Sequence, residues 1–196
     1  MSLPEVETLP MRERILQAAP AVIHRFTLAR FGMEDVAKAV GIARQTIYKH
    51  FPNKDALLIA IYVRQMRERQ VPAMAEAIAK PPSAKNLLGL FMVELGQAML
   101  FPLFEETLDP KTAPLMAELC LNSPELMSVR EEIWLPILDR YVQRGIVRPD
   151  LNRRAAIRWI TYQQFWFLTH PTVLSDSISE IEIYVRDFVI RSLLKA

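Results

Sequence analysis

Residues 36–54 have the sequence VAKAVGIARQTIYKHFPNK, and this stretch decides the fold. Its pattern predicts a short helix, a tight turn at Gly41, a second short helix and a stop at Pro52. The apolar residues fall on one side of both helices, and the polar residues between positions 44 and 50 fall on the other. Two helices too short to bury a core alone, joined across a glycine, are typical of a helix-turn-helix. The second helix of that motif can enter a DNA major groove.

The charges along this stretch agree with a surface that faces DNA. Residues 38–54 contain Lys38, Arg44, Lys49 and Lys54 and no Asp or Glu. Residues 1–54 hold eight Lys and Arg against five Asp and Glu, a net charge of +3. The remaining residues hold sixteen against seventeen, a net charge of −1. Such a small excess predicts that binding depends on where a few cations are placed, and not on bulk charge.

The first sixty residues also match a family pattern of spaced positions. These positions are Ile15, Leu16, Ala18, Ala19, Val36, Ala37, Gly41, Ile42, Ile47, Tyr48, His50, Phe51, Lys54 and Leu57. In them, and above all in the motif TIYKHFPNK at residues 46–54, the chain resembles the tetracycline-repressor (TetR) family of bacterial transcription regulators. The resemblance is specific over residues 11–60 and only architectural beyond them.

Three features depart from the family pattern. Thr27 stands where the family usually has a glycine that ends its first helix, and Phe31 and Gly32 replace the residue that usually caps the second. Pro20 falls inside the first predicted helix, where it removes one backbone hydrogen bond at a cost of roughly 3 kcal/mol. These departures keep an alternative function open, namely a helical ligand-binding or adaptor protein whose head does not bind DNA.

The resemblance assigns roles to the polar side of the second short helix, which we expect at about residues 43–49. Arg44, Gln45 and Thr46 are the expected contacts to base edges, because Arg pairs with guanine, Gln with adenine and a Thr methyl with thymine. The expected phosphate contacts are Tyr48, Lys49, His50 and Lys54. Two other interpretations stay open: a merely solvated polar face, and a packing role for Tyr48.

Caps and prolines divide the chain into a run of helices, and no segment alternates convincingly as a strand. We expect the helix-turn-helix at about residues 33–50. We expect further helices at about residues 10–26, 53–80 with a kink at Pro72, 84–100, 123–144, 152–170 and 178–194, the last opened by Ser177 and Glu180. Prolines predict short helices and turns at 101–115. The predicted fold class is all-α with about nine helices. An N-terminal helix-turn-helix DNA-binding domain covers residues 1–54, and a larger helical domain for effector binding and dimerisation covers residues 55–196.

Composition places the chain among ordinary globular proteins, with 51% hydrophobic and 23% charged residues. The sequence contains no glycine-rich nucleotide-binding motif, no apolar run long enough to span a bilayer and no signal-peptide pattern. We therefore predict a cytoplasmic protein with no cofactor and no membrane partner. His24, His50 and His170 are far apart and Cys120 is the one cysteine, so we expect neither a metal site nor an enzyme.

Bulky, adaptable apolar side chains in the larger domain favour a pocket for a small, largely apolar effector. The candidate pocket residues are Tyr62, Met66, Met92, Met99, Phe101, Phe104, Trp134, Tyr162, Phe165 and Trp166. Glu94, Gln97, Gln163 and His170 could orient the effector. For any single residue of this set, a place in the core is the simpler interpretation.

Two apolar stripes near the C-terminus predict a homodimer. One consists of Ala156, Trp159, Ile160, Gln163 and Phe167, and the other of Ile178, Ile181, Val185, Phe188 and Val189. Two such helices from each protomer, packed across a two-fold axis, would form a four-helix bundle. The residues expected in the interface are Trp159, Gln163, Phe167, Ile181, Val185 and Phe188, and the alternative is a core within one chain.

These patterns predict a ligand-responsive DNA-binding transcription regulator, most simply a repressor. It would bind a pseudo-palindromic double-stranded DNA operator as a homodimer, since a two-fold protein matches a two-fold site. In similar regulators an effector changes the separation of the two DNA-reading heads. A ligand that favours a mismatched separation weakens DNA binding by its differential affinity for the two states.

Overall fold

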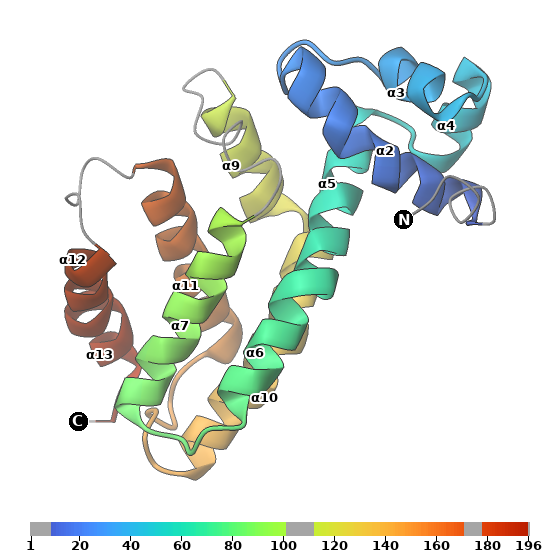
Figure 1. Ribbon diagram of the computed structural model, residues 1–196. Helices are drawn as coiled ribbons and strands as arrows, with labels where there is room; N and C mark the ends of the chain where they lie inside the picture. Colours follow the sequence, from blue (N-terminus) through green and yellow to red (C-terminus); the bar gives the residue numbers. More distant parts are fainter. Residues whose placement is uncertain (1–8, 101–111, 171–177, 196) are drawn as a thin grey trace.

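The computed structural model describes residues 9–100, 112–170 and 178–195, and within these ranges every regular element is a helix (Figure 1). Counted as continuous rods, the described residues form nine helices, so the all-α prediction is confirmed. One isolated antiparallel bridge, between Val147 and Leu194, ties the C-terminus to the loop after residue 143. The predictions for Phe101, Phe104 and Ser177 lie outside the described residues.

Three helices form the N-terminal head: α2 (Met11–Phe26), α3 (Met33–Val40) and α4 (Arg44–His50). Their apolar sides meet in a core that includes Ile15, Ile23 and Ile47, each fully buried. Helix α3 ends at Gly41, whose φ of 74° is a left-handed conformation that glycine adopts without a Cβ clash. The helix-turn-helix predicted from residues 36–54 is therefore present.

The local backbone structure accommodates the positions at which the head departs from the family pattern. Helix α2 continues through Pro20 and ends at Phe26. Thr27 follows with φ 66° and ψ 156°, a combination that is strained for a β-branched residue and is normally reserved for glycine. Gly32 has no side chain to cap α3, but its N–H donates to the carboxylate of Asp35 at 2.8 Å, which is half of a capping box.

One continuous rod leads from the head into the body, and it consists of α5 (Lys54–Gln65), the π-helical turn η1 (Met66–Gln70) and α6 (Val71–Ile78) (Figure 1). Asn53 caps it as predicted, since its side chain accepts the N–H of Ala56. In η1 the N–H of Val71 bonds the carbonyl of Met66, five residues back. The wider turn lies just before Pro72, which has no N–H to donate. The distortion expected at Pro72 is thus a π turn immediately upstream of it.

The rest of the body contains α7 (Ala84–Met99), α9 (Ala113–Asn122), α10 (Pro124–Gln143) and α11 (Arg153–Thr169). The side chains of Ser83, Ser123 and Asn152 cap three of these helices as the sequence predicts. The chain ends in a second rod with a π turn: α12 (Ile178–Tyr184), η2 (Val185–Ile190) and α13 (Arg191–Leu193). Helix α10 packs against both α5 and α11, so it connects the rod that carries the head with the far side of the body.

Candidate nucleic-acid interface and effector site

Helix α4 presents its polar side to solvent. Arg44, Gln45, Lys49 and His50 are exposed, and the fully buried Ile47 anchors the opposite side of the helix in the head. Thr46 is half-buried, and Tyr48 is 39% exposed. Six of the seven residues predicted to contact DNA therefore lie on one short helix, in positions that a groove could reach.

The guanidinium of Arg44 is held by two neighbours in the unbound head. It lies 2.5 Å from the carboxylate of Glu34, in the first turn of α3, and 5.7 Å from the centre of the Tyr48 ring. Both members of the ion pair are more than half exposed, so the pair contributes about 1 kcal/mol or less. A guanine can therefore replace Glu34 as the partner of Arg44 at little cost. Tyr48 supports Arg44 in addition to the phosphate role expected for it.

Lys54, the seventh predicted DNA contact, points into the head. Its ammonium donates to the carbonyl of Leu28 at 2.6 Å and lies 4.1 Å from the centre of the Phe31 ring. Burial lowers the pKa of Lys54, and the charge of Asp55 partly offsets this effect. These contacts give Phe31 a structural role and fasten the turn before α3 to the start of α5. A phosphate contact of Lys54 stays a prediction, and it would have to coexist with them.

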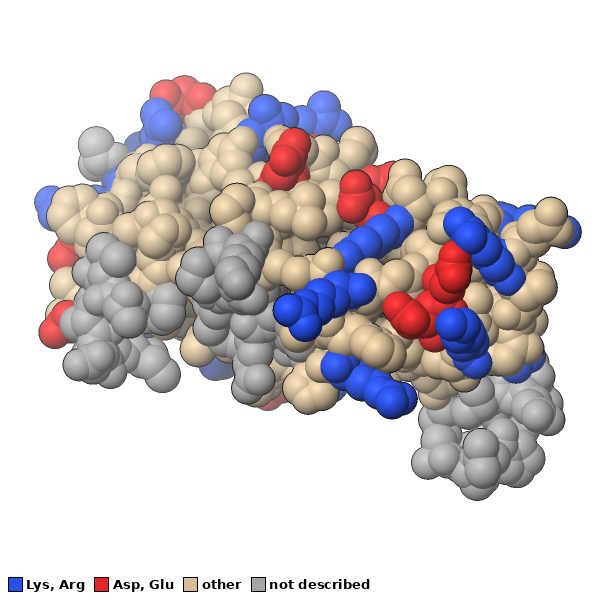
Figure 2. Space-filling model, turned by 90° about the horizontal axis from the view of Figure 1, so that it is seen from above, with Lys and Arg blue, Asp and Glu red and all other residues tan. Residues whose placement is uncertain are grey.

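The charge on the head is scattered. Figure 2, which views the molecule from above, shows blue Lys and Arg side chains separated by uncharged surface and interspersed with red Asp and Glu. The view contains no continuous cationic field. It agrees with the small net charge of residues 1–54 and with the prediction that binding would depend on where a few cations are placed.

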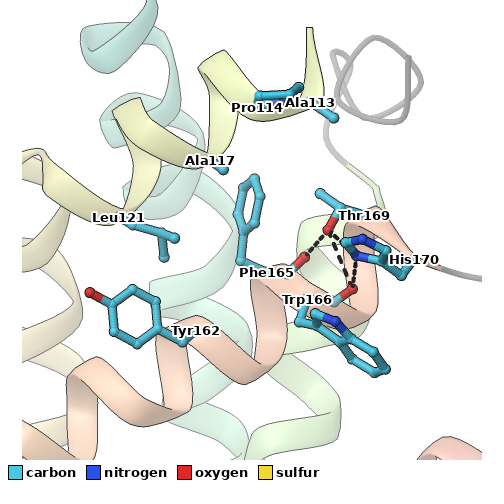
Figure 3. Close-up of a pocket in the computed structure, with 9 residues that line it drawn as sticks. All are labelled: Ala113, Pro114, Ala117, Leu121, Tyr162, Phe165, Trp166, Thr169 and His170. Carbon is cyan, nitrogen blue, oxygen red and sulfur yellow. Dashed lines mark hydrogen bonds between the residues drawn. The ribbon is translucent and has the colours of Figure 1, made fainter. Parts of the chain in front are cut away.

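The body contains an open cavity of about 450 Å³ between α9 and the second half of α11 (Figure 3). Its lining consists of Ala113, Pro114, Ala117, Leu121, Tyr162, Phe165, Trp166, Thr169 and His170. Cavities of this size commonly hold small ligands, with mostly apolar walls and a few polar groups that fix orientation. The lining is apolar and aromatic along its length and polar at the Thr169–His170 end.

Sequence reasoning found one wall of this cavity and missed the other. Tyr162 and Trp166 were predicted, and so were Phe165 and His170, all on α11. The α9 wall was missed, although Ala113, Ala117 and Leu121 recur at every fourth position and so share one helix face. The remaining candidates lie elsewhere: Tyr62, Met66 and Trp134 are buried, Met92 is half-buried and Met99 is exposed.

Trp134 belongs to a buried polar cluster that joins α7, α10 and α11. Its indole N–H donates to Glu94 at 2.6 Å, and the Gln164 amide donates to the same carboxylate oxygen at 2.7 Å. Arg130 donates to the other oxygen of Glu94 at 3.1 Å and to the Gln164 carbonyl at 2.8 Å. Glu94 is 1% exposed, so these bonds compensate for burying its carboxylate. This arrangement supports the core interpretation of Trp134 over the pocket interpretation.

Large apolar side chains on α11 and the last rod are left uncovered by the part of the chain that the structure describes. Trp159 is 45% exposed, Ile183 48% and Phe188 62%, which is unusual for such large side chains on neighbouring helices. Among the predicted interface residues, Gln163 and Ile181 are half-buried. Phe167 and Val185 are different, because they are buried within the chain at 4% and 0% exposure. Both side chains belong to the core of a single chain. The exposed apolar side chains are those of Trp159, Ile183 and Phe188.

Other chemistry finds no site in the part of the chain that the structure describes. No three His, Cys, Asp or Glu side chains there are grouped to hold a metal ion. Burial raises the pKa of the Cys120 thiol to about 12, which disfavours the reactive thiolate form. None of the described helices is long and apolar enough to cross a membrane.

Comparison with known proteins places these features in context. The family model of bacterial regulatory proteins, tetR family, matches residues 15–61, which include α3, α4 and the motif at 46–54. The chain is 25% identical over 144 residues to the HTH-type transcriptional regulator EthR of Mycolicibacterium smegmatis. It is 26% identical over 157 residues to the HTH-type transcriptional regulator UidR of Escherichia coli.

The likeness extends beyond the head at the level of the fold. The EthR alignment covers 72% of this chain and 61% of EthR, and the UidR alignment covers 76% and 74%. This chain thus matches less than two thirds of the length of EthR. The structure of the R. erythropolis transcriptional repressor QsdR, from the TetR family, superposes with a TM-score of 0.68 at 18% identity, over 95% of this chain and 98% of that one.

Proposed function

The chain belongs to the tetR family of bacterial regulatory proteins, and on that premise we propose that it regulates transcription as a ligand-responsive homodimer, most simply as a repressor. Residues 1–54 form the DNA-reading head and residues 55–196 the domain that dimerises and binds the effector. The target is a pseudo-palindromic operator in double-stranded DNA. No covalent chemistry is required of any residue.

The observation that carries this proposal is the geometry of α4. A helix of seven residues would not be stable alone, yet the buried Ile47 anchors it in the head and leaves the side chains of Arg44, Gln45 and Lys49 exposed to solvent. Arg and Gln near the start of such a helix can form paired hydrogen bonds to guanine and adenine. Lys49 and His50, at its other end, suit phosphates.

The uncovered apolar face supports the homodimer. A second copy of the same face would cover Trp159, Ile183 and Phe188 across a two-fold axis, in the four-helix arrangement that the two stripes predict. One head reads only a few base pairs. Two heads on one dimer read two half-sites, which raises both affinity and selectivity.

The effector would act through α11, which serves two surfaces. One side of α11 lines the cavity through Tyr162 and Phe165, and another carries Trp159 of the uncovered face. The Glu94 cluster links α11 to α10, and α10 packs on α5, the first part of the rod below the head. A ligand that binds one arrangement of these helices better than the other changes operator affinity by that difference and no more.

The test is selection of genomic DNA fragments by the purified protein at near-physiological salt. Enrichment of one pseudo-palindrome is expected, with affinity that falls by about 0.9 log units per log unit of salt for each phosphate neutralised. A folded dimer that enriches no sequence, with or without a metabolite mixture, would instead identify the chain as a helical ligand-binding or adaptor protein.

A further inference from the structure

We infer that the cavity between α9 and α11 selects an uncharged, ring-bearing molecule that offers one hydrogen-bond donor, such as a hydroxyl group, to His170. This inference rests on the proposed function, because it names the chemistry of the effector. It excludes carboxylates and organic ammonium ions as preferred ligands. The apolar walls of the cavity, its uncharged lining and its polar end each support one part of this assignment.

The long walls of the cavity suit a flat apolar body. The α9 wall offers only small or aliphatic groups, including Ala113, Ala117 and Leu121, and the α11 wall offers the rings of Tyr162 and Phe165. In Figure 3 the Phe165 ring points from α11 toward Ala117, and Tyr162 lies near Leu121 at one end. A ring system that enters between these walls contacts aromatic faces on one side and methyl groups on the other.

Among the residues that the structure describes, the lining of this cavity includes no Asp, Glu, Lys or Arg side chain. A ligand that brings a full charge between these walls would lose hydration without gaining an ionic partner, which is strongly unfavourable. Charged head groups therefore belong outside this cavity. The preferred ligand is neutral, and its specificity must come from the polar end.

At the polar end, the neighbours of His170 favour the tautomer that carries its proton on Nδ1. The Thr169 hydroxyl donates to the carbonyl of Phe165 at 2.9 Å, so its oxygen can only accept from the imidazole. His170 Nδ1 lies 2.9 Å from that oxygen and 3.2 Å from the carbonyl of Trp166. The Trp166 carbonyl can only accept, so its contact favours a proton on Nδ1. In a neutral imidazole the other nitrogen, Nε2, then has a lone pair and accepts.

Two further features of this end favour a donor. His170 is the residue at which α11 ends, and the C-terminus of a helix carries a partial negative charge. The His170 ring also stacks on Trp166, with centroids 5.5 Å apart and planes at 17°, which holds the imidazole in one orientation. A ligand hydroxyl meets an oriented acceptor here, and a carboxylate meets a lone pair and a negative helix end.

The experiment titrates the full-length protein, at mildly alkaline pH, with five probes that share one ring system. The probes are methylnaphthalene, naphthalenemethanol, the methyl ether of naphthalenemethanol, naphthoate and naphthylmethylamine, and binding is measured by calorimetry. The alcohol should bind roughly three- to tenfold more tightly than the hydrocarbon and the ether, which is the usual worth of one hydrogen bond. The inference is overturned by an ether equal to the alcohol, by tightest binding of naphthoate or the amine, or by no binding of any probe.

Matched variants locate the effect. His170→Phe keeps a ring to stack on Trp166 but removes Nε2, so it should erase the advantage of the alcohol and leave hydrocarbon binding unchanged. Tyr162→Phe, at the opposite end, should preserve that advantage. Nitrogen NMR of His170 in the unmodified protein gives a readout that needs no variant: a proton on Nδ1 is expected, and a proton on Nε2 would overturn the inference.

Operator binding by the same preparation without any probe separates the two proposals. A protein that binds its operator but shows none of the probe preferences retains the proposed regulatory function and loses only this assignment. A protein that shows the preferences but binds no operator retains the assignment, and the regulatory proposal then fails.

Discussion

The helix-turn-helix and the cavity between α9 and α11 are each formed by a pair of helices, but they are specified over very different lengths of chain. Helices α3 and α4 are joined by the three residues between Val40 and Arg44, so local turn chemistry sets their geometry. Helices α9 and α11 are separated by the whole of α10, and only packing in the body brings their faces together. Damage to the body core should therefore disturb the cavity and the dimer and leave the reading surface of α4 intact.

The largest expected effect comes from the buried cluster that holds α11. Glu94→Ala would leave the Arg130 charge without its carboxylate and the Trp134 N–H without its acceptor in the core, at a cost of roughly 3–5 kcal/mol in the free energy of unfolding. Urea denaturation followed by circular dichroism measures this cost. Glu94→Gln, which keeps an acceptor oxygen, is the control and should lose less. A loss below about 1 kcal/mol for the alanine variant would show that the cluster does not support the body.

The next effect concerns association. Phe188→Glu places a charge on the uncovered face at its most exposed large side chain, and it should weaken the homodimer by about 2–4 kcal/mol, as expected for an aromatic residue at an interface centre. Sedimentation velocity at several concentrations gives the dissociation constant. Val71→Glu, at another exposed apolar residue, is the control. Equal association of the two variants would place the dimer contact elsewhere.

A smaller effect is expected at the head, and it should change selectivity without changing the fold. Arg44→Ala should reduce discrimination at particular base pairs by roughly 1–3 kcal/mol. Lys49→Ala should weaken all duplexes alike and reduce the salt slope by about 1. Binding to a panel of single-site operator variants at two salt concentrations measures both. Uniform loss in the two variants would contradict the division into base and phosphate contacts.

The smallest expected change is a gain in stability. Thr27→Gly relieves the strained backbone at φ 66° and should raise the free energy of unfolding by about 1 kcal/mol after the entropic cost of glycine. Thr27→Ala keeps the Cβ and should gain less. Thermal unfolding of the three proteins tests the order, and an alanine variant as stable as the glycine variant would indicate that the Cβ is not the source of strain.

The sequence contained enough information for the helices and their caps, because a cap is a local signal. Asn53, Ser83, Ser123 and Asn152 each accept the backbone bond expected of them. The inward direction of Lys54 was not predictable, since its partner Leu28 lies 26 residues away. The local pattern indicated a cation near the surface that is predicted to face DNA. Only the tertiary structure shows that this cation already contacts Leu28 and Phe31.

The predicted dimer interface shows a second limit, which is that helical periodicity alone does not predict which residues of an apolar side are buried. Val185 and Phe188 are three positions apart and would share one face of an α-helix. They lie instead in the π turn η2, where one is fully buried and the other is 62% exposed. Helix α11 is similar in having apolar residues on two sides, Phe167 inside and Trp159 outside. Apolar residues at helical spacing show that a helix has an apolar side. Only the packing shows whether that side is buried within the chain or is left exposed for a second copy.

The unbroken rod from Lys54 to Ile78 makes the body a lever for the head. At about 1.5 Å per residue it is roughly 37 Å long. A tilt of about 5° at its lower end therefore moves the upper end by roughly 3 Å, which is close to the 3.4 Å rise between base pairs along one DNA strand. In the proposed two-fold dimer, with one such lever in each protomer, a tilt of about 5° would be enough to move both reading helices out of step with their half-sites.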